Sequence, residues 1–137
     1  MKYLIDTNIL SEVTKASSNK GVAKWFSETA PTDMFISVMT IGEVIRGITK
    51  LPEGRKTKLS AWLKEVVYEG FENRIVDIDV KVMATWGEAL AEVSRPLPVQ
   101  DTLLAATALT HDMVVVTRNV KDFNDIAGLK IFNPWSD

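Results

Sequence analysis

The stretch KYLIDTNIL, residues 2–10, decides how the rest of the sequence is interpreted. A run of apolar, strand-forming residues ends at Asp6, and a helical apolar pattern begins at Ile9. We therefore expect Asp6 at the carboxyl end of a buried strand, facing the start of a helix. Ligands and reacting groups gather at that place in open α/β sheets. Asp6 could instead be only a helix cap, so the downstream sequence has to decide.

Strand patterns and helix patterns alternate along the remainder of the chain. Further strands are expected at residues 34–38, 74–78, 113–117 and 129–132. Helices are expected near residues 9–13 and 22–26, and at 40–50, 54–69, 82–93 and 102–111, with a helical turn within 119–126. This alternation implies parallel strands joined by right-handed crossovers. We predict one three-layer α/β/α domain that spans residues 1–137.

Composition limits the function classes. With 46% hydrophobic and 25% charged residues, the chain has the composition of a globular protein and not of a disordered one. No apolar run approaches the ~18 residues of a membrane helix. The lack of cysteine excludes disulfides and thiolate metal ligands, and we expect a cytoplasmic protein. A net charge of −2 argues against coating nucleic acid by bulk charge, but it is compatible with a nuclease.

Four carboxylates follow strands or open helices in this pattern: Asp6, Glu43, Asp101 and Asp122. Each also has a structural explanation. Glu43 could close a capping box with Thr40, and Asp101 could be a plain N-cap after a proline-rich loop. Asp122 could complement a helix dipole or be solvated. Considered together, however, they would lie on one edge of a parallel sheet.

Carboxylates at one edge would repel one another and raise each other's pKa unless a cation compensates. Oxygen donors without histidine or cysteine suit a hard divalent ion, Mg²⁺ or Mn²⁺, and not zinc. Such an ion can polarise a phosphodiester and activate a water molecule. The residues therefore indicate metal-assisted phosphodiester hydrolysis.

Several short motifs, in order along the whole chain, resemble one family. They are LIDTN (4–8), SVMTIGE (37–43) with RG (46–47), VQD (99–101) with LLAATA (103–108), VTRN (116–119) with DF (122–123), and NPW (133–135). In these motifs the sequence resembles the PIN-domain ribonucleases, specifically the VapC toxins of bacterial toxin–antitoxin pairs.

The resemblance implies a PIN-like fold with a central five-stranded parallel sheet, and an acidic pocket for one or two Mg²⁺ or Mn²⁺ ions. It also implies endonucleolytic RNA cleavage, neutralisation by a cognate VapB-type antitoxin, and a homodimer. Asp6 and Asp101 match the principal metal ligands, and Glu43 matches the carboxylate that completes the pocket, by metal ligation or by orienting the metal-bound water. The polar residues around them are matched by Thr7, Asn8 and Thr117.

The sequence departs from the family pattern at the fourth acid. Many relatives carry Asp directly after the Thr-Arg or Thr-Asn pair, whereas Asn119 stands there in this chain. Asp122, slightly farther on, is the preferred substitute, with Asn119 as a supporting residue. Basic residues that flank the motifs could meet RNA phosphates. They are Lys15, Lys20, Arg46, Arg95, Arg118 and Lys121, of which Arg46 and Arg118 are the favoured pair.

Two other functions remain open. A PIN-like module with a weak or inactive site could act by binding a protein partner or RNA, and Asn119 in place of an acid favours this alternative. An acidic phosphatase or receiver-type domain with Asp6 as phosphate acceptor is a weaker alternative, because a phosphatase would carry a second Asp where this chain has Asn8.

Overall fold

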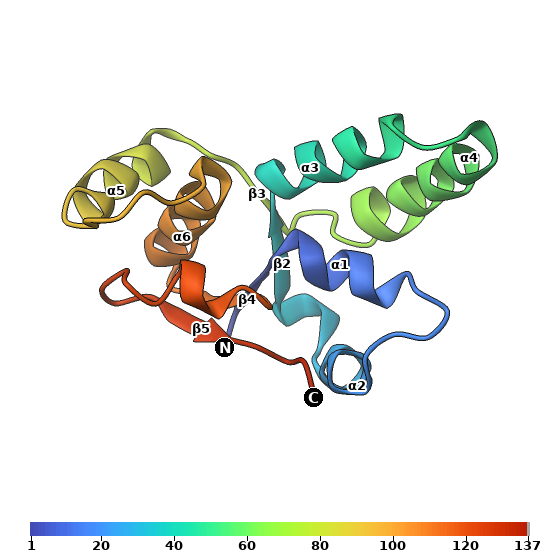
Figure 1. Cartoon of the computed structure of the whole chain (residues 1–137), viewed down its shortest axis with the longest axis horizontal. Helices are drawn as coiled ribbons and strands as arrows, with labels where there is room; N and C mark the ends of the chain where they lie inside the picture. Colours follow the sequence, from blue (N-terminus) through green and yellow to red (C-terminus); the bar gives the residue numbers. More distant parts are fainter. Residues whose placement is uncertain (137) are drawn as a thin grey trace.

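The centre of the protein is a five-stranded parallel sheet, seen in a computed structural model that describes residues 1–136 (Figure 1). Its strands are β1 (Tyr3–Ile5), β2 (Met34–Ser37), β3 (Ile75–Val76), β4 (Val114–Val116) and β5 (Lys130–Phe132). They lie in the order β3-β2-β1-β4-β5, and every neighbouring pair is parallel. The predicted sheet is confirmed, with the strand before Asp6 at its centre.

Helices cover both faces of the sheet (Figure 1). They are α1 (Thr7–Val13), α2 (Lys20–Glu28), α3 (Val38–Thr49), α4 (Glu53–Trp62), α5 (Val80–Leu90) and α6 (Val99–His111). Three shorter helical segments complete the set: η1 (Pro31–Asp33), η2 (Leu63–Glu69) and η3 (Val120–Asp122). The predicted three-layer α/β/α arrangement is therefore confirmed. Among residues 1–136, no helix is long and apolar enough to cross a membrane.

Alternating strand residues build two cores. In β1, Ile5 packs with α1, α2 and η2, whereas Leu4 packs with α6 on the opposite face. In β4, Val116 packs in the same core as Ile5, and Val115 packs in the same core as Leu4. Successive side chains of a strand point to opposite faces. All four side chains are completely buried. This explains why these strands read as continuous apolar runs.

Two elements differ from the sequence expectation. The third strand is shorter than the predicted range 74–78, because β3 is an edge strand that pairs only with β2, and the exposed Asp77 lies beyond its end. The helix predicted at 54–69 changes character inside that range: α4 ends at Trp62, and the chain continues as the π-helix η2.

Candidate active site

Asp6 lies where β1 passes into α1, and it has two roles there. It is the N-cap of α1, and its Oδ1 accepts a hydrogen bond from the Thr7 N–H at 2.7 Å. Its Oδ2 accepts a hydrogen bond of 2.8 Å from the hydroxyl of Thr117, which follows β4. Asp6 is only 8% exposed. The capping role is therefore real, but it uses one carboxylate oxygen and leaves the other facing the end of β4.

Thr117 and Asn8 connect the ends of β1 and β4. The fully buried Thr117 hydroxyl accepts from the Asn119 N–H at 3.0 Å while it donates to Asp6. The Asn8 amide nitrogen lies 3.4 Å from both the Asp6 carboxylate and the Thr117 hydroxyl, and its Oδ1 accepts from the Arg118 N–H. The side chains of Thr117 and Asn8 therefore fix the Asp6 carboxylate in one orientation.

Glu43 does not close the capping box considered from the sequence. The N-cap of α3 is Ser37, whose hydroxyl accepts from the Met39 N–H at 3.0 Å. Thr40 lies inside the helix, and its buried hydroxyl has no hydrogen-bond partner among the described residues. Glu43 instead accepts a 2.8 Å hydrogen bond from the Thr7 hydroxyl. Capping by Ser37 starts the helix before Thr40, which frees Glu43 to turn toward α1.

Asp101 occupies a different local position from the one expected, whereas Asp122 lies in the predicted helical turn. α6 begins at Val99 after Pro98, so Asp101 lies within the first turn and is not the N-cap. Asp122 is the last residue of η3 and is partly buried. Neither carboxylate has a capping hydrogen bond in the described part of the chain.

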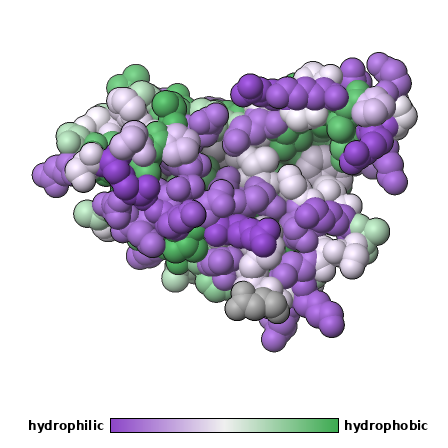
Figure 2. Space-filling model, viewed as in Figure 1, coloured by the Kyte–Doolittle hydropathy of each residue, from purple (hydrophilic) through white to green (hydrophobic). Residues whose placement is uncertain are grey.

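An open cavity of about 380 Å³ joins these segments. Its walls include six of the residues singled out by the sequence: Asp6, Thr7, Asn8, Glu43, Asp101 and Asn119. Lys15 and Arg118, which the sequence also singled out, line this cavity as well, whereas Arg46 lines a separate cavity to which Glu43 also contributes. Asp122 does not line it, but its charge acts on Asp6 and Asp101. Hydrophilic side chains cover the middle of the molecule, where α1, α6 and the end of β4 meet (Figures 1 and 2).

The shared cavity raises the pKa of three carboxyl groups. Burial is the main cause of the raised pKa of Asp6, and it exceeds the opposing effect of the hydrogen bonds from Thr117 and Thr7. Burial likewise raises the pKa of Glu43, with a further increase from the charge of Asp6. Burial raises the pKa of Asp101 to about 6, helped by the charges of Asp6, Asp122 and Glu43. The carboxylates are close enough to repel one another.

The donor chemistry of this cavity fits a hard divalent cation, since it offers carboxylate, hydroxyl and amide oxygens. The carboxylates lie farther apart than the ligands of an occupied metal site. Within residues 1–136, no three acidic, histidine or cysteine side chains already group at metal-binding distance. Hydrogen bonds hold the carboxylates of Asp6 and Glu43, so Asp101 is the side chain that would close around an ion.

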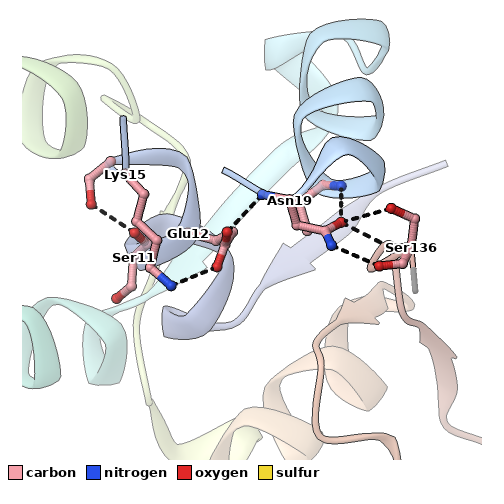
Figure 3. Close-up of polar contacts among 7 residues, drawn as sticks. Ser11, Glu12, Lys15, Asn19 and Ser136 are labelled. Atoms are coloured by element: carbon pink, nitrogen blue, oxygen red, sulfur yellow. Dashed lines mark hydrogen bonds and ion pairs between the residues drawn. The ribbon is translucent and has the colours of Figure 1, made fainter. Parts of the chain in front are cut away.

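Three cavity residues were not predicted at the site, although the last belongs to the NPW motif: Ser11, Glu12 and Trp135. Glu12 is nearly buried and accepts hydrogen bonds from the Asn19 N–H at 2.8 Å and from Lys15 at 3.0 Å (Figure 3). These contacts hold the pKa of Glu12 below its usual value. The three-residue spacing of Glu12 and Lys15 could have suggested their pairing, although Lys15 lies just beyond the end of α1. No local pattern could have placed Trp135, because it lies in the tail after the last strand.

Comparison with known proteins identifies the family. Residues 3–129 match the PIN domain. The chain belongs to the PIN domain family. This PIN domain is 29% identical over 136 residues to VapC ribonuclease Y4jK of Sinorhizobium fredii, with 96% of each chain covered. It is 30% identical to Toxin FitB of Neisseria gonorrhoeae, with 98% of this chain and 99% of FitB covered.

A solved structure agrees with these relatives. The crystal structure of FitAcB from Neisseria gonorrhoeae superimposes with a TM-score of 0.90 and 28% identity, and the match covers 98% of this PIN domain and 99% of that chain. The resemblance to PIN-domain proteins of the VapC type is therefore confirmed.

Proposed function

We propose that this PIN domain is a Mg²⁺-dependent endoribonuclease of the VapC toxin type, with Mn²⁺ as an alternative ion. The observation that carries the proposal is the convergence of Asp6, Glu43 and Asp101 on one cavity, each with a raised pKa. These residues come from three distant segments of the chain. A bound divalent cation would relieve the repulsion among their carboxylates, which favours its binding. The names of Y4jK, a VapC ribonuclease, and FitB, a toxin, support this assignment.

Asp6 and Asp101 are the proposed metal ligands, and Glu43 completes the acidic site. When bound, the ion polarises the phosphodiester and activates a water molecule. Thr117 and Thr7 orient the carboxylates of Asp6 and Glu43 through the hydrogen bonds described above. The position of the fourth acid stays a prediction: Asn119 lines the cavity, whereas Asp122 contributes its charge from outside the lining.

The proposed partners are RNA, a cognate antitoxin and a second copy of the chain. A nuclease toxin must be held inactive in the cell that makes it, which requires an antitoxin that covers the acidic cavity or its approach. Exposed apolar side chains at the starts of α5 and α6 offer a surface that the second copy would cover. Val80 is 87% exposed, Val99 62% and Met83 41%.

Expression of the chain alone, followed by mapping of new RNA 5′ ends, tests the activity. Asp6→Asn and Asp101→Asn should each abolish Mg²⁺-dependent cleavage while circular dichroism shows a folded protein. Asp77→Asn is the matched control, because Asp77 also follows a strand but lies exposed outside the cavity. Full activity in Asp6→Asn would overturn the proposal.

A second candidate function is a PIN-like module that binds RNA or a protein without cutting. Asn119 in the cavity wall favours it, because the amide lowers the negative charge available to a cation. Calorimetric titration with Mg²⁺ separates the two functions. Saturable binding near physiological concentration supports the nuclease, and its absence supports the module.

A further inference from the structure

The C-terminal tail is fastened to the start of α2 through Asn19. The Asn19 side-chain oxygen caps α2 by accepting from the Gly21 and Val22 N–H groups at 3.0 and 3.2 Å. The same oxygen accepts from the Ser136 N–H at 3.0 Å, and the Asn19 amide donates to the Ser136 carbonyl at 2.8 Å (Figure 3). Asn19 therefore caps the start of α2 and binds the C-terminal tail at the same point.

Gly21 makes this close approach possible. A Cβ atom at Gly21 would lie 2.3 Å from the Pro134 carbonyl oxygen and 2.6 Å from the Ser136 nitrogen, which is closer than atoms can pack. The Gly21 N–H also lies 3.1 Å from the Ser136 hydroxyl oxygen. The residues on either side of Trp135 are thus held against α2, and the position of the indole ring is fixed with them.

The fastened tail places Trp135 in the wall of the acidic cavity, where it meets Arg118. The Arg118 guanidinium carbon lies 5.2 Å from the centre of the Trp135 ring, a cation–π contact. Arg118 follows Thr117, whose hydroxyl binds Asp6, and its own side chain is exposed and lines the cavity. Within residues 1–136, Arg118 makes no ion pair with a carboxylate. The exposed guanidinium of Arg118 and the partly buried indole of Trp135, which also packs against the first core, therefore lie together in the cavity wall beside the carboxylates.

We propose that Trp135 and Arg118 form a platform on which an unpaired RNA base stacks, next to the bond that is cut. This inference rests on the proposed ribonuclease function and adds a substrate-positioning site to it. Bases of single-stranded RNA stack on aromatic rings and on guanidinium planes. An acidic cavity repels a polyanion, so a cation at its rim is needed to bring a phosphate close. Asn19 and Gly21 act as positioning residues through the tail.

Binding of a fluorescein-labelled, unpaired oligoribonucleotide, followed by anisotropy in EDTA, tests the platform without cleavage. Trp135→Leu should weaken binding by about 5- to 100-fold, the range for loss of one base–aromatic stack. Trp135→Phe should retain most of the affinity, and Arg118→Lys should lose several-fold because it keeps the charge but not the plane. Tyr68→Leu is the matched control, an exposed aromatic residue outside the cavity.

A variant remote from the cavity wall tests the role of the tail. Gly21→Ala should reproduce much of the Trp135→Leu loss, because the new methyl group pushes the tail away from α2. Gly87→Ala, where a Cβ would meet nothing within 4 Å, should bind as the wild type does. Thermal unfolding of each variant verifies the fold. Because Arg118 is exposed, Arg118→Lys should fold and still test the platform if Trp135→Leu does not fold.

Replacing each base in turn by an abasic site locates the stack. One abasic position should weaken wild-type binding and have no further effect in Trp135→Leu. Wild-type protein without saturable binding, or Trp135→Leu binding within twofold of wild type, overturns the platform. If Trp135→Leu binds RNA as the wild type does but no longer forms a dimer, Trp135 serves contacts between copies of the chain. That result would also overturn the platform.

The platform and the nuclease can fail separately. Trp135-dependent binding without Mg²⁺-dependent cleavage would refute the nuclease and keep the platform. Cleavage by Trp135→Leu with unchanged KM and kcat would keep the nuclease and refute the platform.

Discussion

At the scale of single residues, the acidic cavity brings the buried Asp6 together with the partly buried Glu43 and Asp101. Asp6 satisfies its oxygens with Thr7 and Thr117, and Glu43 uses the Thr7 hydroxyl. Asp101 has neither kind of support, and burial, together with the charges of three neighbouring carboxylates, raises its pKa to about 6. Without a cation, Asp101 is therefore the least favourable charge in the cavity.

Asp101→Asn should stabilise the metal-free protein at neutral pH and not in acid. The folded pKa of about 6 exceeds the ordinary value of 3.8, so the folded state holds the proton more tightly. The resulting penalty is absent below pH 3.8, grows as the pH rises, and is complete above about 6. After allowance for solvent screening, we expect a gain on the order of 1 kcal/mol.

Urea unfolding in EDTA at pH 4 and pH 7.5 measures this difference. Asp77→Asn, a substitution at an exposed acid, should show little change at either pH. An equal gain for Asp101→Asn at both pH values would contradict the electrostatic explanation.

At the scale of elements, the N-cap of α3, Ser37, determines where the Glu43 side chain lies. Ser37 ends β2 and caps α3 directly, with no loop between strand and helix. The helix therefore begins at Val38, and Glu43 lies far enough along it to reach Thr7 of α1. A start at Thr40 would have used Glu43 as a capping partner and withdrawn it from the cavity.

Substitutions at Ser37 and Thr40 should have opposite effects on stability. Ser37→Ala removes the side-chain cap of α3 and should cost about 1 kcal/mol. Thr40→Val removes a buried hydroxyl that has no partner among the described residues, and it should stabilise the protein by about 1 kcal/mol. Chemical denaturation of both variants decides between the two possible caps. A larger loss at Thr40 than at Ser37 would restore the capping box.

At the scale of the whole molecule, the parallel sheet brings the cavity together. β1, β2 and β4 are adjacent, and their carboxyl ends lie at the same edge of the sheet. Asp6, Glu43 and Thr117 follow those ends, while α6 brings Asp101 to them from the other face. The site therefore belongs to no single element, and its repulsion is a property of the folded chain.

A divalent cation should consequently stabilise the whole fold. Selective binding to the folded state adds about 2.7 kcal/mol when the free ion is at roughly 100 times its Kd. Thermal unfolding in MgCl₂ or MnCl₂, compared with NaCl of equal ionic strength, should show a higher Tm for the wild type and for Asp77→Asn. Asp6→Asn should lose most of the increase. The same increase in Asp6→Asn would place the ion elsewhere on the protein.

The local sequence determined the alternation of strands and helices, the parallel sheet, and the acids at strand ends. These features depend on short-range causes: the period of apolar residues, the burial of β-branched strands on both faces, and the turn of the chain after each strand. The motif around Asp6 could be recognised for the same reason, since its cap and its strand are neighbours in the chain.

Only the tertiary structure decided which acids face the cavity and what accompanies them. Glu43 bonds to Thr7 instead of to its own helix, Asp122 stands behind the lining, and Trp135 reaches the cavity because Asn19 holds the tail. Each outcome depends on contacts between residues far apart in the sequence. Such contacts are fixed by packing and by competition among hydrogen-bond partners, and neither is encoded in a local pattern.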